Sequence, residues 1–257
     1  MDVVKTQVAE GVLTATLADV ENRNALGHAL LSGLLEAIRV ANADPKIRAV
    51  VVTNEGSTFC AGANLKQRSS EKSKASGSGG FTELLTAIQT SPTPVIGRIE
   101  GHVVGGGNGL AAALDISIAR DDVKFGFTEV RLGVIPAMIS VVCLPKMRHG
   151  DAMEAFLRGN RFPATRAAEL GLINRAVPAD QLDAAVEEVL SDLRKGGPNA
   201  LGLAKRLVYE VPPRDQTDAF EWTTALSNEL FAGEEASEGM KAFLGKRLES
   251  WATTDSD

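Results

Sequence analysis

The residues of this chain best suited to chemistry are three consecutive glycines at 105–107 and one acidic residue farther along, Glu129. The glycines follow an apolar run at 94–99, which predicts a strand, and precede a helix-forming segment at 110–114. That order leaves unpaired backbone N–H groups at the start of the helix, at the positive end of its dipole. Glycine has no Cβ, so a ligand atom can approach these donors closely. The segment therefore predicts a site for an anionic or oxyanionic ligand atom.

Glu129 lies between two largely apolar stretches, 125–128 and 130–133. A carboxylate in such surroundings is either a paired structural charge or a working acid or base. Two peptide N–H groups aimed at a carbonyl oxygen would stabilise an enolate-like charge, while a nearby glutamate moves a proton at the adjacent carbon. The alternative is that the glycines only allow close helix–strand packing and that Glu129 pairs with Arg131 or Lys124.

Other glycine and nucleophile motifs do not fit. The dinucleotide-binding pattern needs a small residue where Leu110 stands, and no Lys-Ser or Lys-Thr follows the glycines as in a phosphate-binding loop. The one Gly-Ser-Gly run lies at 77–79, inside a polar segment at 68–80 that we expect to be mobile, so a nucleophile elbow is absent. Cys60, beside Phe59, is better interpreted as a small buried thiol than as a nucleophile.

Composition narrows the class of protein. The 257 residues carry a net charge of −6, which argues against a nucleic-acid or anionic-membrane surface. No apolar run approaches a membrane-spanning length, and residues 1–10 lack the pattern of a signal peptide. Two cysteines make neither a disulfide framework nor a metal site, and the three histidines show no ligand spacing. We therefore expect a cytoplasmic protein without a metal.

The elements that must position these residues alternate between strands and helices. A loop at 54–64 and a helical turn at Leu65 are expected after the third strand. This order indicates an α/β core with parallel pairing. Strands are expected at 3–8, 12–17, 47–53, 95–99, 116–119 and 123–127, and helices at 30–44, 81–89 and 110–114.

After Pro136 the pattern becomes helical. Several of the helices have apolar faces, so the last sixty or so residues must cover either their own core or a neighbouring subunit. The expected helices lie at 150–158, 163–170, 182–193, 199–210, 216–231 and 234–250.

Taken together, four segments resemble the enoyl-CoA hydratase/isomerase (crotonase) superfamily over almost the whole chain. They are Arg23-Asn24-Ala25-Leu26, the run from Phe59 to Lys66, the stretch 101–136, and 238–243 with Lys246-Arg247.

The resemblance implies an α/β fold in which β-β-α units form a spiral and a helical C-terminal region packs subunits into trimers or hexamers. Residues 1–195 would form the spiral core with the coenzyme A (CoA) and active sites, and residues 196–257 the trimerisation region. A bent acyl-CoA ligand would place its thioester oxygen between the N–H groups of Ala63 and Gly106. Glu129 would protonate or deprotonate the α-carbon region. CoA would be part of the substrate, with no separate cofactor.

Other positions would contact the ligand. The resemblance places Arg23, Ala25, Ala61 and Lys66 near the CoA adenine and phosphates, and Phe243 and Lys246 on a helix that reaches the CoA of a neighbouring subunit. Asn64 replaces the aspartate that is usual in the family. Gly109 stands where two-glutamate hydratases have their other carboxylate, and we expect the space left there to suit a branched or bulkier acyl group. Asn108 is a weak candidate for holding water in its place.

The sequence therefore predicts an enoyl-CoA hydratase, a lyase, acting on a branched or glutaconyl-type thioester. One alternative is an enoyl-CoA isomerase that uses Glu129 alone as a proton shuttle. Another is a non-catalytic acyl-CoA-binding protein that keeps the pocket without turnover.

Overall fold

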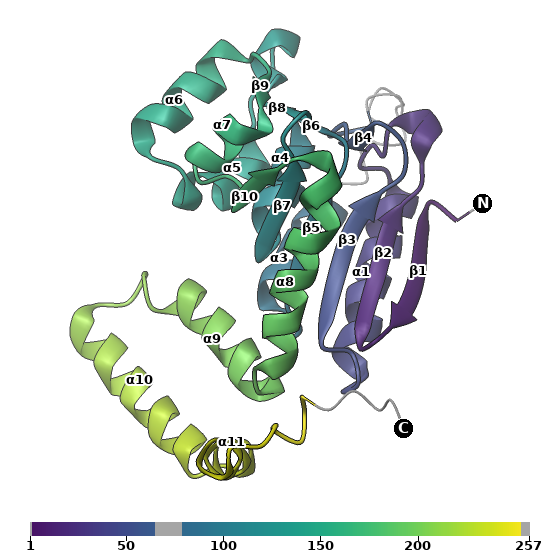
Figure 1. Ribbon diagram of the computed structural model, residues 1–257. Coiled ribbons are helices and arrows are strands. Elements are labelled where there is room, and N and C mark those ends of the chain that lie inside the picture. Colours follow the sequence, from purple (N-terminus) through teal and green to yellow (C-terminus); the bar gives the residue numbers. More distant parts are fainter. Residues whose placement is uncertain (1, 65–78, 253–257) are drawn as a thin grey trace.

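The computed structural model describes residues 2–64 and 79–252. Two β-sheets lie in its upper body, helices surround them, and a group of C-terminal helices extends below (Figure 1). No helix in the described residues is long and apolar enough to cross a membrane.

The larger sheet has six strands in the order β1-β2-β3-β5-β7-β10. Its first two strands form an antiparallel hairpin, whose turn residues Glu10 and Gly11 both have positive φ angles, of 48° and 71°. All other pairings in this sheet are parallel, as the sequence predicted. The strands are β1 (Val4–Ala9), β2 (Val12–Leu17), β3 (Ala49–Asn54), β5 (Val95–Ile99), β7 (Ile116–Arg120) and β10 (Arg175–Val177).

The smaller sheet has four short strands in the order β4-β6-β8-β9. They are β4 (Thr58–Cys60), β6 (His102–Val104), β8 (Lys124–Gly126) and β9 (Phe162–Pro163). Strands β3, β5 and β7 of the large sheet are each followed by a strand of the small sheet and, among the described elements, then by a helix, as in β5-β6-α4, where α4 spans Gly106–Ala113. This repetition is the spiral of β-β-α units that the family resemblance implied.

Helices cover both faces of the large sheet because side chains alternate along its strands. Val50 and Val52 face the main core, formed with helices α1, α3 and α4, whereas Ala49 and Val51 face helix α8. The helices of the body are α1 (His28–Ala43), α3 (Gly79–Thr90), α4 (Gly106–Ala113), α5 (Ala137–Cys143), α6 (His149–Arg158), α7 (Ala164–Glu169) and α8 (Leu182–Lys195).

The C-terminal tail comprises α9 (Pro198–Glu210), α10 (Gln216–Phe231) and α11 (Glu234–Gly245). It points away from the body, and neither α9 nor α10 contains a buried residue (Figure 1). The predicted division after residue 195 falls in the link between α8 and α9. That residues 196–257 form a trimerisation region stays a prediction.

Several expectations about the elements were wrong or incomplete. The predicted loop 54–64 contains strand β4, and strand β6 and helix α5 were not foreseen. The last helix ends at Gly245, five residues before the predicted end. Gly79 and Gly80 belong to α3 rather than to a mobile segment, whereas the rest of that segment, and Leu65, lie outside the described residues.

Candidate active site

Three parallel strands of the small sheet bring the candidate site together. Cys60 on β4 pairs with Val103 on β6, and Val104 on β6 pairs with Gly126 on β8. Parallel strands end at the same edge of a sheet, which is where ligands bind in open α/β folds. The segments that follow these three strands carry Ala63, Gly106 and Glu129, respectively.

The two predicted backbone donors lie side by side. A Cβ built on Gly106 would be 3.7 Å from the Ala63 nitrogen, and one built on Gly62 would be 2.8 Å from the Gly106 nitrogen. Gly62 also has a φ of +83°, so both conformation and space require glycine there. Ala63 N–H has no protein acceptor among the described residues, and Gly106 N–H is an unpaired donor at the start of α4.

Asn108 fixes the direction of the Gly106 donor. Its side-chain Nδ2 donates to the Gly105 carbonyl at 3.0 Å and to the Gly126 carbonyl at 2.9 Å, and its backbone N–H also donates to the Gly105 carbonyl. In a trans peptide the carbonyl and the next N–H point in opposite directions. Holding the Gly105 carbonyl therefore aims the Gly106 N–H away from Asn108. The side chain is fully buried, and its Oδ1 has no hydrogen-bond partner among the described residues, so a role for Asn108 in holding water stays a prediction.

The Glu129 carboxylate faces the same turn. Its Oε1 would lie 3.5 Å from a Cβ on Gly105, and its Oε2 is buried without a hydrogen-bond partner. Burial raises the pKa of Glu129 above its ordinary value, opposed in part by a hydrogen bond with its own backbone. The alternative of an ion pair is wrong, because neither Arg131 nor Lys124 forms one with Glu129 among the described residues.

The space expected beside Gly109 is filled. A Cβ on this glycine would be 2.2 Å from the Cγ2 atom of Ile139, which lies on α5 and is itself buried. The reasoning that this position leaves room for a branched acyl group is therefore wrong. A role for Gly109 in contacting the substrate stays a prediction.

The predicted CoA-binding residues fall into two groups. The Arg23 carbonyl accepts a hydrogen bond from Ala61 N–H at 3.1 Å, and the buried Ala25 adjoins Leu26, whose N–H donates to the Gly62 carbonyl at 2.7 Å. These residues therefore lie beside the candidate donors.

Phe243 lies in α11 and Lys246 directly follows it, and α11 is at the opposite end of the molecule from β4 (Figure 1). Within one chain they are not brought to Glu129. Lys66 lies outside the described residues.

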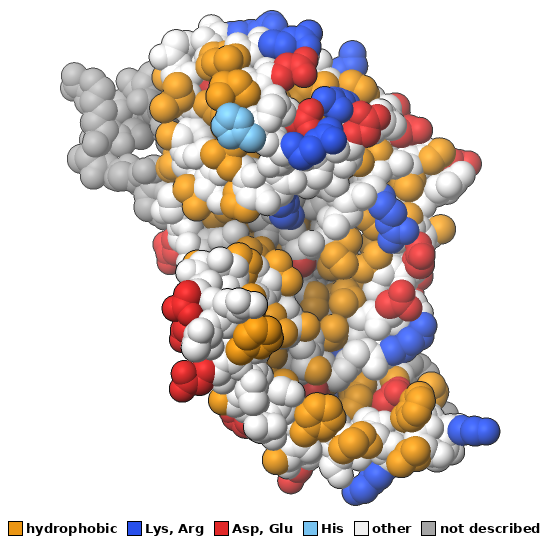
Figure 2. All heavy atoms as spheres, turned by 90° about the vertical axis from the view of Figure 1, so that its left-hand side faces the viewer, with side chains coloured by type: hydrophobic (Ala, Val, Ile, Leu, Met, Phe, Trp, Pro, Cys, Tyr) orange, Lys and Arg blue, Asp and Glu red, His pale blue; other side chains and the backbone are white. Residues whose placement is uncertain are grey.

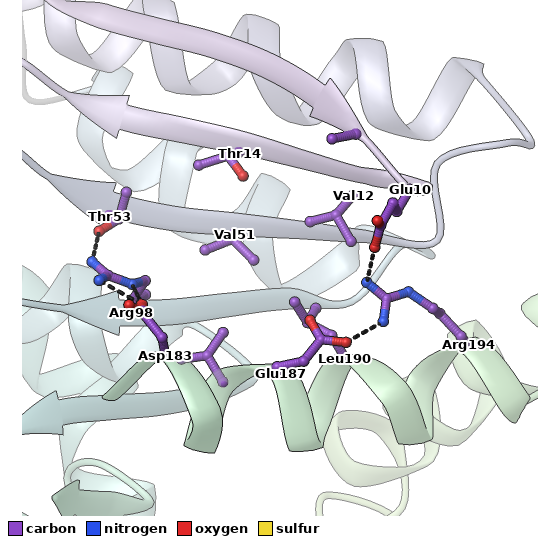
Figure 3. A pocket seen from close by; sticks show the side chains of 12 residues that line it. Glu10, Val12, Thr14, Val51, Thr53, Arg98, Asp183, Glu187, Leu190 and Arg194 are labelled. Atoms are coloured by element: carbon purple, nitrogen blue, oxygen red, sulfur yellow. Dashed lines mark hydrogen bonds and ion pairs between the residues drawn. The ribbon is translucent and has the colours of Figure 1, made fainter. Parts of the chain in front are cut away.

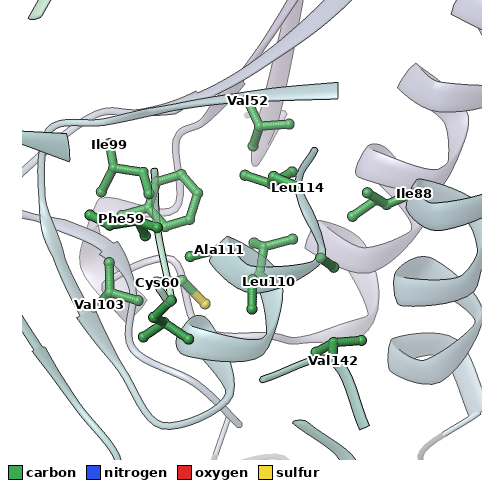
Figure 4. Packing of buried hydrophobic residues seen from close by; sticks show 14 of the residues in the cluster. Val52, Phe59, Cys60, Ile88, Ile99, Val103, Leu110, Ala111, Leu114 and Val142 are labelled. Atoms are coloured by element: carbon green, nitrogen blue, oxygen red, sulfur yellow. The ribbon is translucent and has the colours of Figure 1, made fainter. Parts of the chain in front are cut away.

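The cysteines belong to the core rather than to the chemistry. Figure 4 shows Cys60 among apolar side chains that include Phe59 and Leu110. Burial raises the pKa of the Cys60 thiol to about 12, so it is protonated at neutral pH, as a buried thiol should be. No three His, Cys, Asp or Glu side chains in residues 2–64 and 79–252 come together as a metal site would require.

A groove between α8 and the large sheet is a separate feature (Figure 3). Arg98 at one end pairs with Asp183, and Arg194 at the other end pairs with Glu187. These arginines are already neutralised by acidic partners. We therefore assign the chemistry to the edge of the small sheet.

Known proteins resemble this chain over almost its whole length. The sequence model of the enoyl-CoA hydratase/isomerase family matches residues 7–254. The enoyl-CoA hydratase EchA19 of Mycobacterium tuberculosis is 30% identical over 241 residues, covering 91% of each chain. A crystal structure of an enoyl-CoA hydratase from Mycobacterium smegmatis matches with a TM-score of 0.91 at 30% identity, covering 98% of this chain and 100% of that one. An enoyl-CoA hydratase/isomerase from Marinobacter aquaeolei matches with a TM-score of 0.91 at 27% identity, over 98% of this chain and 100% of the other. The chain therefore belongs to the enoyl-CoA hydratase/isomerase family and has the crotonase fold.

Proposed function

We propose that this protein adds water to an enoyl-CoA thioester, or removes it, with CoA as part of the substrate and no separate cofactor. The observation that carries the proposal is the Glu129 carboxylate, whose buried Oε2 has no hydrogen-bond partner among the described residues and whose Oε1 faces Gly105, beside the free N–H groups of Ala63 and Gly106. A buried carboxylate oxygen without a partner is destabilising, so its retention beside two orphan donors favours a catalytic role.

The proposed reaction needs one carboxylate. The N–H groups of Ala63 and Gly106 hold the thioester oxygen, where negative charge develops as a water oxygen bonds to the β-carbon. Glu129 accepts a proton from that water and then donates it to the α-carbon, so that H and OH are added across the double bond. Because its pKa is raised by burial, Glu129 is a stronger base than an exposed glutamate.

Double-bond migration is a second candidate, favoured by the packing of Ile139 on Gly109. That packing leaves no room for a carboxylate at position 109. Glu129 could remove a proton from one carbon of the acyl chain and return it to another, with the same two donors stabilising the enolate. This reaction requires no bound water.

One assay separates the two activities. The purified protein is incubated with crotonyl-CoA, a methylglutaconyl-type CoA and a 3-enoyl-CoA, and the products are identified by mass spectrometry. Hydration adds the mass of one water, whereas migration leaves the mass unchanged and moves the double bond. Binding of these esters without either product would overturn the enzymatic proposal and leave an acyl-CoA-binding protein.

Assembly into a homotrimer, or a pair of trimers, forms part of the proposal. Phe220, Phe231 and Phe243 on the tail helices are 65%, 69% and 81% exposed in the single chain. Figure 2 shows apolar side chains over this tail and a hollow between the tail and the body. In the assembly, a neighbouring subunit would cover these faces, and Phe243 and Lys246 would approach its CoA.

A further inference from the structure

Gly109 faces Ile139 so closely that no side chain fits between them. A Cβ on Gly109 would lie 2.2 Å from the Cγ2 and 2.7 Å from the Cβ of Ile139, distances at which one group must move. Ile139 is only 3% exposed, so it is packed in the main core rather than free to turn into solvent. Glycine at 109 is therefore what allows helix α5 to close onto helix α4, with the isoleucine side chain lying directly on the α4 backbone.

This contact lies about one helical turn along the chain from the residue that faces the candidate carboxylate. Gly105 precedes α4 as its N-terminal cap, and Gly109 lies four residues later within the helix. The first faces Glu129 Oε1 and the second faces Ile139. Gly109 is about 4.5 Å farther along the axis than Gly106, at 1.5 Å per residue. With the thioester oxygen on Gly106 N–H, that offset is comparable to the reach of the β-carbon and its substituents.

Cys143 shows that the same face of α5 packs against α4. It follows Ile139 by one turn, and its Sγ lies 3.8 Å from the Asn108 carbonyl on α4. Burial raises the pKa of the Cys143 thiol, and the charge of Glu129 raises it further. The thiol is therefore neutral, and the α5 face beside Glu129 is made of Ile139 and an uncharged thiol.

We propose that Ile139 is a specificity-determining residue, which fills the space beside Glu129 on the α4 side and excludes acyl groups branched at the β-carbon. The proposal rests on the proposed function, since the thioester must be held by Ala63 and Gly106 for its β-carbon to lie here. A preference for straight acyl groups is the opposite of the preference for branched ones that the sequence suggested from Gly109 alone.

The test compares straight and branched esters in Ile139 variants. Binding of butyryl-CoA and 3-methylbutyryl-CoA is measured by calorimetry, and turnover is measured with crotonyl-CoA and 3-methylcrotonyl-CoA. One methyl group in an apolar pocket changes discrimination between substrates by about tenfold or more. Ile139→Ala should therefore raise, by at least that factor, the affinity and the kcat/KM for the branched ester relative to those for the straight ester. Wild-type protein should prefer the straight esters.

Val142→Ala is the matched control, since Val142 is a buried residue of the same helix that packs in the main core (Figure 4). It should lower the melting temperature without altering the ratio. If Ile139→Ala does not fold, Ile139→Val removes one methyl group and should still shift the ratio several-fold in the same direction.

An unchanged ratio in folded Ile139 variants would overturn the specificity role, even if the enzyme hydrates its substrates normally. Altered binding ratios without turnover of any enoyl ester would leave that role intact and overturn the proposed function. Failure of the wild-type protein to bind any of these esters would overturn both.

Discussion

Glu129 combines partial burial, an Oε2 atom without a hydrogen-bond partner and proximity to two orphan N–H groups. Each property can be explained locally. The parallel pairing of β6 and β8 brings residue 129 to the Gly105 turn, and the apolar residues around it remove water from the carboxylate. The same desolvation that makes the side chain a better base also makes the folded protein less stable, as is common at active sites.

Replacing the carboxylate by an amide of the same shape tests its role. Glu129→Gln should lower kcat by about two to four orders of magnitude, the usual contribution of a positioned acid or base. The dissociation constant for butyryl-CoA should change little, because the backbone donors remain. Glu36→Gln is the control, since Glu36 is an exposed carboxylate on α1 paired with Arg39. Wild-type kcat in Glu129→Gln would show that the carboxylate is structural.

The stability of Glu129→Gln relative to the wild-type protein should depend on pH in a defined direction. Because the pKa of Glu129 is raised from 4.5 by burial, the native state binds more protons than the unfolded state in the window above 4.5. Wild-type stability attributable to this group therefore falls as pH rises through that window, and levels off above the native pKa.

Glu129→Gln lacks this loss, so the difference in melting temperature, variant minus wild type, should increase between pH 4 and pH 8. Other carboxyl groups, such as Asp115, are common to both proteins and cancel in the difference. A difference that is constant with pH, or that shrinks as pH rises, would contradict the burial of an unpaired carboxylate.

At the scale of elements, the start of α4 depends on Asn108. Its Nδ2 holds the carbonyl of Gly105, a residue whose φ of 56° and ψ of −126° suit only glycine. Asn108→Ala removes one of the two hydrogen bonds that orient the following peptide, while the backbone bond from residue 108 remains. We therefore expect kcat to fall by less than the roughly 10²–10³-fold that follows loss of a whole oxyanion donor.

Two variants at Gly106 calibrate that result. Gly106→Pro removes the donor, at a first helical position that tolerates proline, and should approach the full loss. Gly106→Ala keeps the N–H and places a Cβ 2.9 Å from the flexible end of Leu26. The thioester C=O frequency in an isotope-edited infrared spectrum of bound butyryl-CoA rises as its hydrogen bonds weaken. It should be lowest in Gly106→Ala, higher in Asn108→Ala and highest in Gly106→Pro. A frequency insensitive to these changes would remove Gly106 from the oxyanion site.

Sequence patterns predicted five of the six strands of the large sheet, all but β10, but only β8 of the small sheet. Strand β3 is buried along its whole length, and a run of β-branched residues identifies such a strand without knowledge of its neighbours. Strands β4 and β6 have only three residues each, too few to show a period of two. Their assignment depends on pairing with segments about forty residues away, which no local pattern reports.

The same limit applies to the site. Gly106 and Glu129 were identified because glycines between a strand and a helix, and a lone acid in an apolar stretch, are unusual locally. The contact between Ile139 and Gly109 and the bond from Asn108 to Gly126 join different segments, so they appear only once the chain is folded. For the bond from Asn108, the one signal in the sequence is an asparagine directly after a glycine run at the start of a helix.

At the scale of the whole molecule, the tail is fixed to the body by polar contacts at its first helix. Lys205 on α9 forms an ion pair of 2.8 Å with Asp115, directly after α4, and also donates to the Ile88 carbonyl. Arg48 donates to the carbonyls of Gly196 and Trp251 and so ties both ends of the tail to the large sheet. These contacts orient the tail but leave its apolar faces without cover in the single chain.

Those faces give the last prediction. A Phe side chain buries about 150–250 Å² when covered, at roughly 25 cal/mol per Å², so Phe231 and Phe243 together favour association by several kcal/mol. Wild-type protein should sediment as a trimer or hexamer, and Phe231→Asp/Phe243→Asp should shift it toward the monomer. Lys241→Asp is the control, because it also introduces an aspartate at an exposed position of α11 but removes no apolar side chain. This variant should sediment as the wild-type protein does. Because Phe243 would approach a neighbour's CoA, the double variant should also weaken butyryl-CoA binding as it dissociates. A monomeric wild type that binds the ester tightly would show that each chain forms its site alone, with the tail serving another contact.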